Sequence, residues 1–228
     1  MTQVNHLIEI QGLKKTYQSG DTKVDAIKEM NFHIDDEEFI TIMGQSGSGK
    51  STLLSIMGAL NHPTEGKVLV DSLDLYSLST EQRADFRSEY IGFIFQSFQL
   101  ISYLTVLENV KLPMAVTGQR KKIKNQMALE VIERVGLGAK AHRLPDQLSG
   151  GEQERVAVAR AIVNKPPVIL ADEPTGNLDS KTANDIMMLL QSLNKDGHTI
   201  IVVTHNQDMA AYATRTVKVQ DGVCIVDN

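Results

Sequence analysis

The residues best suited to chemistry form a short glycine-rich segment that ends in Lys50 and Ser51. Glycines let successive backbone N–H groups turn toward an anion, and a following helix N-terminus adds the positive end of its dipole. The lysine of such a loop reaches the β- and γ-phosphates of a nucleotide, and the next hydroxyl binds Mg²⁺. The pattern G-x-x-x-x-G-K-[ST] therefore predicts a nucleoside triphosphate site at Gly44, Gln45, Ser46, Gly47, Ser48, Gly49, Lys50 and Ser51, with Thr52 on the α-phosphate side.

Two adjacent acids at the end of an apolar run are the second candidate for chemistry. A carboxylate at this place holds Mg²⁺, which predicts Asp172 as a metal ligand together with Ser51. The neighbouring Glu173 is then placed to polarise a water that attacks the γ-phosphate. Adjacent acids also occur at ordinary strand ends, so the catalytic role of Glu173 depends on the motifs around it.

The phosphate loop has the flanking elements that its mechanism needs. The apolar run Phe39 to Met43 favours a strand before it, and the stretch from Lys50 to about Ala59 favours a helix after it. Two further apolar runs, Val168 to Ala171 and Thr199 to Val203, are separated by the helical stretch Thr182 to Leu193. Strand, helix and strand in this order predict a parallel βαβ unit.

The rest of the sequence favours smaller additions to this core. Strand-like runs cover Leu7 to Ile10 and Ala26 to Ile34, and Asp221 and Gly222 separate two alternating runs, which predicts a hairpin. Between Glu81 and Ala161 the pattern becomes helical. Its apolar face at near-3.6 spacing consists of Met127, Leu129, Val131, Ile132, Val135 and Leu137.

Composition excludes several classes of protein. The 228 residues carry 23 Lys and Arg against 28 Asp and Glu, a net charge of -5, so there is no broad positive surface for nucleic acid. No run of about 18 apolar residues occurs, and the N-terminal residues lack the pattern of a signal peptide. We therefore expect no nucleic acid partner, no membrane span and no export.

The segment Leu148 to Gln153, LSGGEQ, precedes a helical stretch and resembles the signature motif of the ABC ATPase family. In that family the signature residues of one subunit contact the γ-phosphate held by the P-loop of the other. The resemblance implies that Ser149, Gly150 and Gly151 act in trans, as a second helix N-terminus aimed at an anion. Glu152 departs from the family's commoner Gln, and we expect little consequence because it lies beyond the contact residues.

The same resemblance gives roles to residues that local sequence alone leaves open. His205 matches the switch histidine that touches the γ-phosphate, and Gln96 matches the Q-loop glutamine that contacts Mg²⁺ and water. Tyr17 matches the aromatic residue that stacks on adenine, and Asp179 matches the D-loop acid near the partner's P-loop. The resemblance thus implies Glu173, His205, Gln96 and Lys50 as catalytic residues, and Ser51, Gln96 and Asp172 as magnesium ligands.

The resemblance runs from Tyr17 to His205 and implies the ABC ATPase fold. This α/β fold is a P-loop NTPase core with a parallel sheet, an antiparallel β subdomain and an inserted α-helical subdomain, here expected at about residues 87–161 of a single domain spanning 1–228. The family forms dimers that close around two Mg-ATP. Since no site residue looks degenerate, we expect two identical copies.

The family resemblance also implies an ATPase subunit at the cytoplasmic face of the inner membrane. Its partners would be a second copy and an integral membrane permease of the FtsX/MacB type, contacted near Gln96 to Tyr103. A periplasmic or extracellular adaptor, reached through the permease, stays open as a further partner. The segments GFIFQSFQL, LENVKLPM and LADEPTGNLDS favour the group of macrolide exporters, lipoprotein-releasing systems and antimicrobial-peptide transporters.

Two other functions compete with transport. A soluble ABC ATPase acting on a macromolecular complex is the alternative, although such proteins usually carry two cassettes or a long coiled-coil insertion. A P-loop kinase gives no account of the LSGGEQ segment. The sequence leaves the transported substrate and its direction open.

Overall fold

The computed structural model describes residues 6–226, and its centre is one sheet in the order β5-β4-β1-β2-β10-β9-β3-β8-β7-β6. The strands are β1 (Ile8–Ser19), β2 (Thr22–Ile34), β3 (Phe39–Met43), β4 (Glu65–Val70), β5 (Leu73–Asp74), β6 (Ile91–Ile94), β7 (Val168–Asp172), β8 (Thr199–Thr204), β9 (Arg215–Gln220) and β10 (Val223–Val226). The helices are α1 (Lys50–Met57), α2 (Thr80–Tyr90), α3 (Val106–Lys111), α4 (Lys121–Arg134), α5 (Gly150–Ile162), α6 (Ser180–Lys195) and α7 (Gln207–Ala210). Short 3₁₀ turns are η1 (Leu112–Val116), η2 (Gly138–Lys140) and η3 (Pro145–Gln147).

The parallel half of the sheet forms where the apolar runs predict it. Strand β3 pairs in parallel with β8 and β9, and β7 pairs in parallel with β6 and β8. Helix α6 connects β7 to β8, which confirms the predicted βαβ unit. Because these strands are parallel, their carboxyl ends meet at one edge of the sheet, which is where ligands bind in open α/β folds.

The other half is mainly antiparallel, and β10 joins it to the rest of the sheet through a parallel pairing with β2. Strands β1 and β2 pair with each other, and β1 pairs with β4. The predicted hairpin at Asp221 and Gly222 is confirmed: it joins β9 to β10, and both residues have the positive φ that a two-residue turn requires. Strand β1 extends well beyond the expected Leu7 to Ile10, because its second part pairs with β2 despite a polar sequence.

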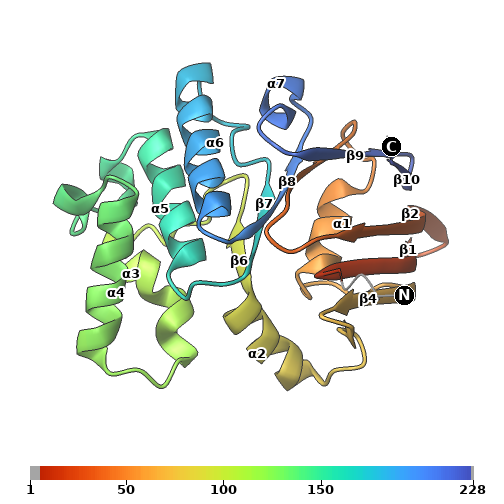
Figure 1. Cartoon of the computed structure of the whole chain (residues 1–228), viewed down its shortest axis with the longest axis horizontal. Coiled ribbons are helices and arrows are strands. Elements are labelled where there is room, and N and C mark those ends of the chain that lie inside the picture. The colour runs from red at the N-terminus through yellow and green to blue at the C-terminus, as the bar shows by residue number, and fades with distance from the viewer. Residues whose placement is uncertain (1–5, 227–228) are drawn as a thin grey trace.

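The sheet separates two hydrophobic clusters, because successive residues of its parallel strands point to opposite faces. Ile201 and Val203 of β8 pack with α1, whereas Ile200 and Val202 pack with α3 to α6. Figure 1 shows α1 on one side of β7 and β8, and α3, α4, α5 and α6 on the other. Consequently the helix after the phosphate loop and the helix after LSGG lie on opposite faces.

The helical insertion begins later than expected. Residues 91–94 fall inside the range of about 87–161, yet they form β6, which pairs with β7 at the edge of the central sheet. The run is too short and apolar for periodicity to distinguish a buried strand from a helix. Helices α3, α4 and α5 follow it, and within residues 6–226 no helix has the length and apolar composition to cross a bilayer.

Asn109 holds the loop that enters this helical part. It is fully buried on α3, where its Oδ1 accepts from the N–H of Ile101 and its Nδ2 donates to the carbonyls of Ile101, Leu104 and Thr105. One side chain therefore bonds four backbone groups; the Ile101 and Thr105 carbonyls also accept from the N–H groups of Leu104 and Asn109, whereas the Ile101 N–H and the Leu104 carbonyl depend on the Asn109 side chain.

Replacing this side chain should destabilise the protein. We expect Asn109→Ala to lower the free energy of unfolding by about 1–3 kcal/mol, because buried loop groups lose their partner. Asn125→Ala is the control, since Asn125 is half-buried on α4 and accepts from Lys111. Urea unfolding measures both, and equal small effects would contradict the special role of Asn109.

Candidate functional site

The phosphate loop lies between β3 and α1 and is packed too closely for side chains at two glycines. A Cβ on Gly44 would lie 2.1 Å from the carbonyl oxygen of Val219. Gly49 has φ of 101°, and a Cβ there would lie 2.3 Å from the carbonyl oxygen of Ala26. The two glycines Gly44 and Gly49 of the G-x-x-x-x-G-K-[ST] pattern are therefore also required for the loop to pack against β9 and β2.

Two polar groups of the loop fit a phosphate ligand. Lys50 is only 6% exposed, and its Nζ donates to the carbonyl oxygens of Gly44 and Gln45, both at 2.8 Å. The hydroxyl of Ser48 is buried without a hydrogen-bond partner among the described residues. A buried hydroxyl without a hydrogen-bond partner destabilises a fold, so a bound phosphate oxygen that accepts from Ser48 would stabilise the loop.

The two predicted magnesium ligands from distant segments are in contact. The hydroxyl of Ser51 donates to Oδ1 of Asp172 at 3.0 Å, which joins the start of α1 to the end of β7. Burial raises the pKa of the Asp172 carboxyl, against the opposing effect of the Ser51 hydrogen bond. A divalent cation would offset this desolvation, so the pair fits Mg²⁺, whose preferred ligands are oxygens.

Glu173 and His205 are also brought together. Nδ1 of His205 lies 2.7 Å from Oε1 of Glu173, and the two residues follow the neighbouring strands β7 and β8. Glu173 has a positive φ of 48°, and its backbone N–H donates to the carbonyl of Val203. A non-glycine residue in this conformation costs about 1–3 kcal/mol and is typical of functional sites.

The loop that carries Gln96 is held by two residues that the sequence did not point to. Asn177 Nδ2 donates to the carbonyl of Gln96 at 2.8 Å. The guanidinium of Arg160, on α5, donates to the carbonyls of Phe98 and Gln99, which both have positive φ. The signature helix thus fixes the backbone of the Gln96 loop. The only sequence signal for Arg160 is a charge within the apolar run VAVARAIV.

The signature residues cap α5 on the face opposite to α1. Ser149 is exposed and is the N-cap: its Oγ accepts from the N–H of Glu152, while a Glu152 carboxylate oxygen accepts from the Ser149 N–H. Glu152 also pairs with Lys140, and this hydrogen bond is the main cause that lowers the pKa of its carboxyl. Since a Gln could also complete this capping box, what the departure to Glu adds is the charged pair with Lys140.

The remaining signature and D-loop residues pack against each other. A Cβ on Gly151 would lie 2.3 Å from Cγ2 of Thr182, so glycine is required for α5 to approach the start of α6. Gly150 begins α5 near Leu178. Asp179 caps α6 and accepts from the N–H groups of Lys181 and Thr182. In a single chain, Asp179 thus has a capping role, and its predicted contact with a partner stays a prediction.

Tyr17 lies on β1 and is 41% exposed. Its hydroxyl accepts from Asn61 Nδ2 at 2.6 Å, and Lys15 Nζ lies 4.8 Å from its ring centroid. One face of the ring thus already has a cationic neighbour. Its stacking on adenine stays a prediction that rests on resemblance.

Glu154 is a buried acid that the sequence did not single out. It is 1% exposed, and neither carboxylate oxygen has a hydrogen-bond partner among the described residues. Burial raises its pKa to about 8, against the opposing charge of Arg160. An acid so placed is stable in its protonated form.

The stability of the protein should depend on pH through this carboxyl. Because its folded-state pKa is raised, the stability that it contributes is present below the ordinary value of 4.5 and is lost as pH rises toward about 8. We expect Glu154→Gln to remove this loss. In urea unfolding, the free energy of unfolding of the variant should therefore rise relative to that of the wild type as pH increases from 4.5 to about 8. Glu130→Gln, an exposed control on α4, should follow the wild type. Parallel pH profiles for wild type and Glu154→Gln would contradict the assignment.

Comparisons with known proteins agree with this arrangement. The sequence pattern that defines the family "ABC transporter" matches residues 27–176. An uncharacterised ABC transporter ATP-binding protein of Methanocaldococcus jannaschii is 48% identical over 216 residues, which cover 95% of this chain and 96% of the relative. A dimeric ATP-binding cassette in a post-hydrolysis state, bound to ADP and phosphate, has a TM-score of 0.88 at 43% identity and covers 97% of both chains.

A further group of relatives is longer than this chain. The macrolide export ATP-binding/permease protein MacB of Shewanella sp. is 43% identical over 97% of the chain, which spans only 34% of that relative. The solved structures confirm the expected fold, and the relatives confirm the resemblance inferred from LSGGEQ. This chain belongs to the ABC transporter family, of which it is an ATP-binding, ATP-hydrolysing component.

Proposed function

We propose that the chain works as a homodimer in which each ATP lies between the phosphate loop of one copy and Ser149, Gly150 and Gly151 of the other. One observation carries this proposal: α1 and α5 pack on opposite faces of the sheet. Ser149 and the N-terminus of α5 are exposed or half-buried at the surface, where a second copy can reach them. The dimeric post-hydrolysis cassette with ADP and phosphate supports this arrangement.

Each site residue then has a proposed role, which for Lys50, Ser51, Asp172, Glu173 and His205 is supported by their contacts and for Gln96 by the family resemblance. Lys50 exchanges its two carbonyl partners for the β- and γ-phosphates, a stronger charged contact. Ser51 and Asp172, with Gln96 as the family resemblance implies, would hold Mg²⁺, which would supply positive charge beside the phosphates. Glu173 accepts a proton from the attacking water, while His205 orients Glu173 and reaches the γ-phosphate.

The Glu173→Gln variant tests the catalytic part. An amide cannot accept the proton, so we expect steady-state ATP hydrolysis to fall by about 10²–10⁴-fold while ATP binding is retained. Gel filtration should then show an ATP-dependent dimer. Glu130→Gln serves as the control for loss of an unrelated carboxylate. Unchanged turnover in Glu173→Gln would remove Glu173 from this role.

We also propose a membrane permease as the partner, docked beside the predicted contact stretch of Gln96 to Tyr103. Tyr103 is 79% exposed, whereas Phe98, Leu100 and Ile101 are half-buried. A pocket of about 400 Å³ adjoins this stretch between α2, β6 and η1. Its apolar lining includes Phe95, the residue before Gln96, and the exposed Leu60, Leu112 and Val116.

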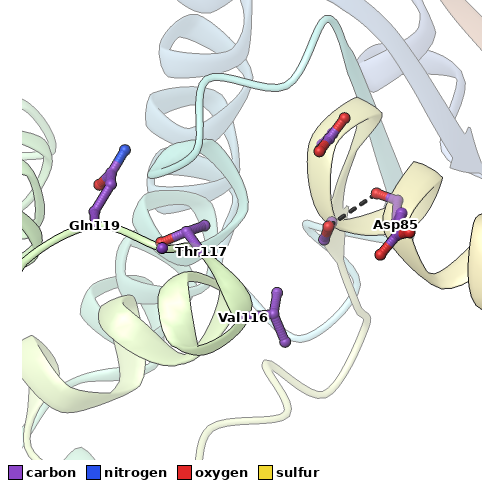
Figure 2. A pocket seen from close by; sticks show the side chains of 7 residues that line it. Asp85, Val116, Thr117 and Gln119 are labelled. Carbon is purple, nitrogen blue, oxygen red and sulfur yellow. Dashed lines mark hydrogen bonds between the residues drawn. The ribbon is translucent and has the colours of Figure 1, made fainter.

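A second pocket of about 450 Å³ shares Ser88 and Val116 with the first. Figure 2 shows Asp85 of α2 on one side of it, with Val116, Thr117 and Gln119 on the other. Asp85 and Glu89 make its α2 wall acidic. The permease segment that suits both pockets is a short amphipathic helix. Its apolar side chains would enter the first pocket, and its basic end would face Asp85 and Glu89 of the second.

A charge placed in the apolar pocket should separate the permease from this subunit. We expect Leu60→Glu to abolish stoichiometric co-purification of a multi-span protein from gently solubilised host membranes, while the ATPase activity of the isolated subunit is unchanged. Leu73→Glu, on the far edge strand β5 and equally exposed, is the matched control. Retained co-purification with Leu60→Glu would exclude this pocket as the dock.

We further propose that the subunit lies at the cytoplasmic face of the inner membrane and serves the exporter group. The 43% identity to a macrolide export protein supports this choice. The substrate would then be a macrolide, an antimicrobial peptide or a lipoprotein-like molecule, and an adaptor beyond the permease is compatible with it. If only soluble ribosomal or DNA-bound partners co-purified with the wild type, the alternative of a non-transport ABC ATPase would replace the transport proposal.

A further inference from the structure

Three potential metal ligands meet at the start of β1, away from every residue assigned above. His6 precedes β1, His33 lies near the end of β2, and Asp35 follows β2. One nitrogen or oxygen atom of each lies within 4.8 Å of the others. We propose that these three side chains bind a divalent transition-metal ion of the zinc class.

One pair of ligand atoms is close to the spacing that such an ion requires, whereas the stacked rings of His6 and His33 must tilt apart before each can point a nitrogen at it. Nδ1 of His6 lies 2.6 Å from Oδ1 of Asp35, and the ring centroids of His6 and His33 are 3.7 Å apart. Zinc binds imidazole nitrogen and carboxylate oxygen at about 2.0–2.2 Å, so ligand atoms of a tetrahedral site lie about 3.4 Å apart. The ion would replace the hydrogen bond between His6 and Asp35. The distance between Nδ1 of His6 and Oδ1 of Asp35 would then increase by less than about 1 Å.

The sheet fixes the backbone positions of the three residues. Ile8 is paired with Ile34, and both side chains are buried, so the strand ends that carry His6 and Asp35 are anchored beside each other. The carbonyl of Leu7 accepts from the N–H of Asp71, which holds the residue next to His6. His33 and Asp35 are two residues apart on an extended chain and therefore share a face.

An ion pair behind the cluster adds a supporting layer. Arg215 pairs with both carboxylate oxygens of Glu38 and also donates to the carbonyl of His33. Glu38 in turn accepts from the backbone N–H of Asp35. The Arg215–Glu38 pair thus holds the backbone of two of the three ligand residues, which fixes where the chain presents their side chains.

The choice of ligands points to the class of ion. Imidazole nitrogens with one carboxylate suit zinc and its transition-metal neighbours, whereas Mg²⁺ and Ca²⁺ prefer oxygen ligands. The simple alternative is a hydrogen-bonded His6–Asp35 pair with the His33 ring stacked on His6, which binds no ion. The two readings differ in whether metal is bound and whether all three residues contribute to it.

The position of the site defines its expected effect. Glu38 directly precedes β3, and the phosphate loop follows the other end of that strand. A metal ion here would join the start of β1 to the β2–β3 turn without touching nucleotide. It would act as a structural clasp, and ATP hydrolysis by the isolated subunit would not need it.

Calorimetric titration of metal-stripped, tag-free protein with Zn²⁺ tests the proposal. We expect one ion per chain, a rise in melting temperature with Zn²⁺, and no comparable response to Mg²⁺ at the same concentration in the absence of nucleotide. His33→Ala and Asp35→Asn should each weaken zinc binding at least about tenfold, a loss of about 1.4 kcal/mol or more in binding free energy. Each should also abolish the rise in melting temperature.

Controls distinguish this site from adventitious binding and from misfolding. His142→Gln removes an exposed histidine elsewhere and should bind zinc as the wild type does. ATP affinity measured on each variant verifies the fold. The proposal is overturned if the wild type shows no zinc binding at micromolar concentrations, or if zinc binding survives in the His6→Asn, His33→Ala double variant.

Discussion

The structure depends on a sheet whose parallel strands are buried on both faces. Their carboxyl ends place Asp172, Glu173 and His205 along one edge, beside the phosphate loop that follows β3. The same alternation of side chains assigns α1 to one face and α5 to the other. Each helix N-terminus is a potential anion site, but the sheet between them keeps a single chain from using both on one phosphate. The proposed dimer follows from this constraint.

The loops at this edge are connected to each other by specific contacts. Asn177 holds the Gln96 carbonyl, and Arg160 of the signature helix holds the next part of the same loop. Gly151 allows α5 to touch α6 at Thr182, next to the cap residue Asp179. A change in the contacts of Gln96 therefore reaches α5 through hydrogen bonds and close packing. Arg160, which bonds this loop, also lines the proposed permease pocket, so the proposed nucleotide and permease sites share a residue.

The parts of the fold with strong local patterns could be predicted from the sequence. The strands β3, β7 and β8 are short apolar runs. The spacing of glycines, Lys50 and Ser51 in the phosphate loop is specific to phosphate binding. Four apolar residues carry no period, so the sequence predicts strand β6 only as part of the helical insertion. The polar residues Lys14, Lys15 and Thr16 give no local signal for the second half of β1, where Lys15 and Thr16 pair with β2 and Lys14 pairs with β4. Asn177, Arg160 and Glu154 have significance only through tertiary contacts, which no local pattern reveals.

A mixing experiment tests the shared site most directly. Lys50→Ala damages the phosphate loop and Ser149→Arg damages the signature, so each homodimer has two defective sites. In a mixed dimer one site carries both defects and the other carries neither. The account predicts that two inactive variants, mixed with ATP, recover a substantial part of wild-type hydrolysis. Activity that stays at the level of the separate variants, although mixed dimers form, would contradict a site shared between two copies.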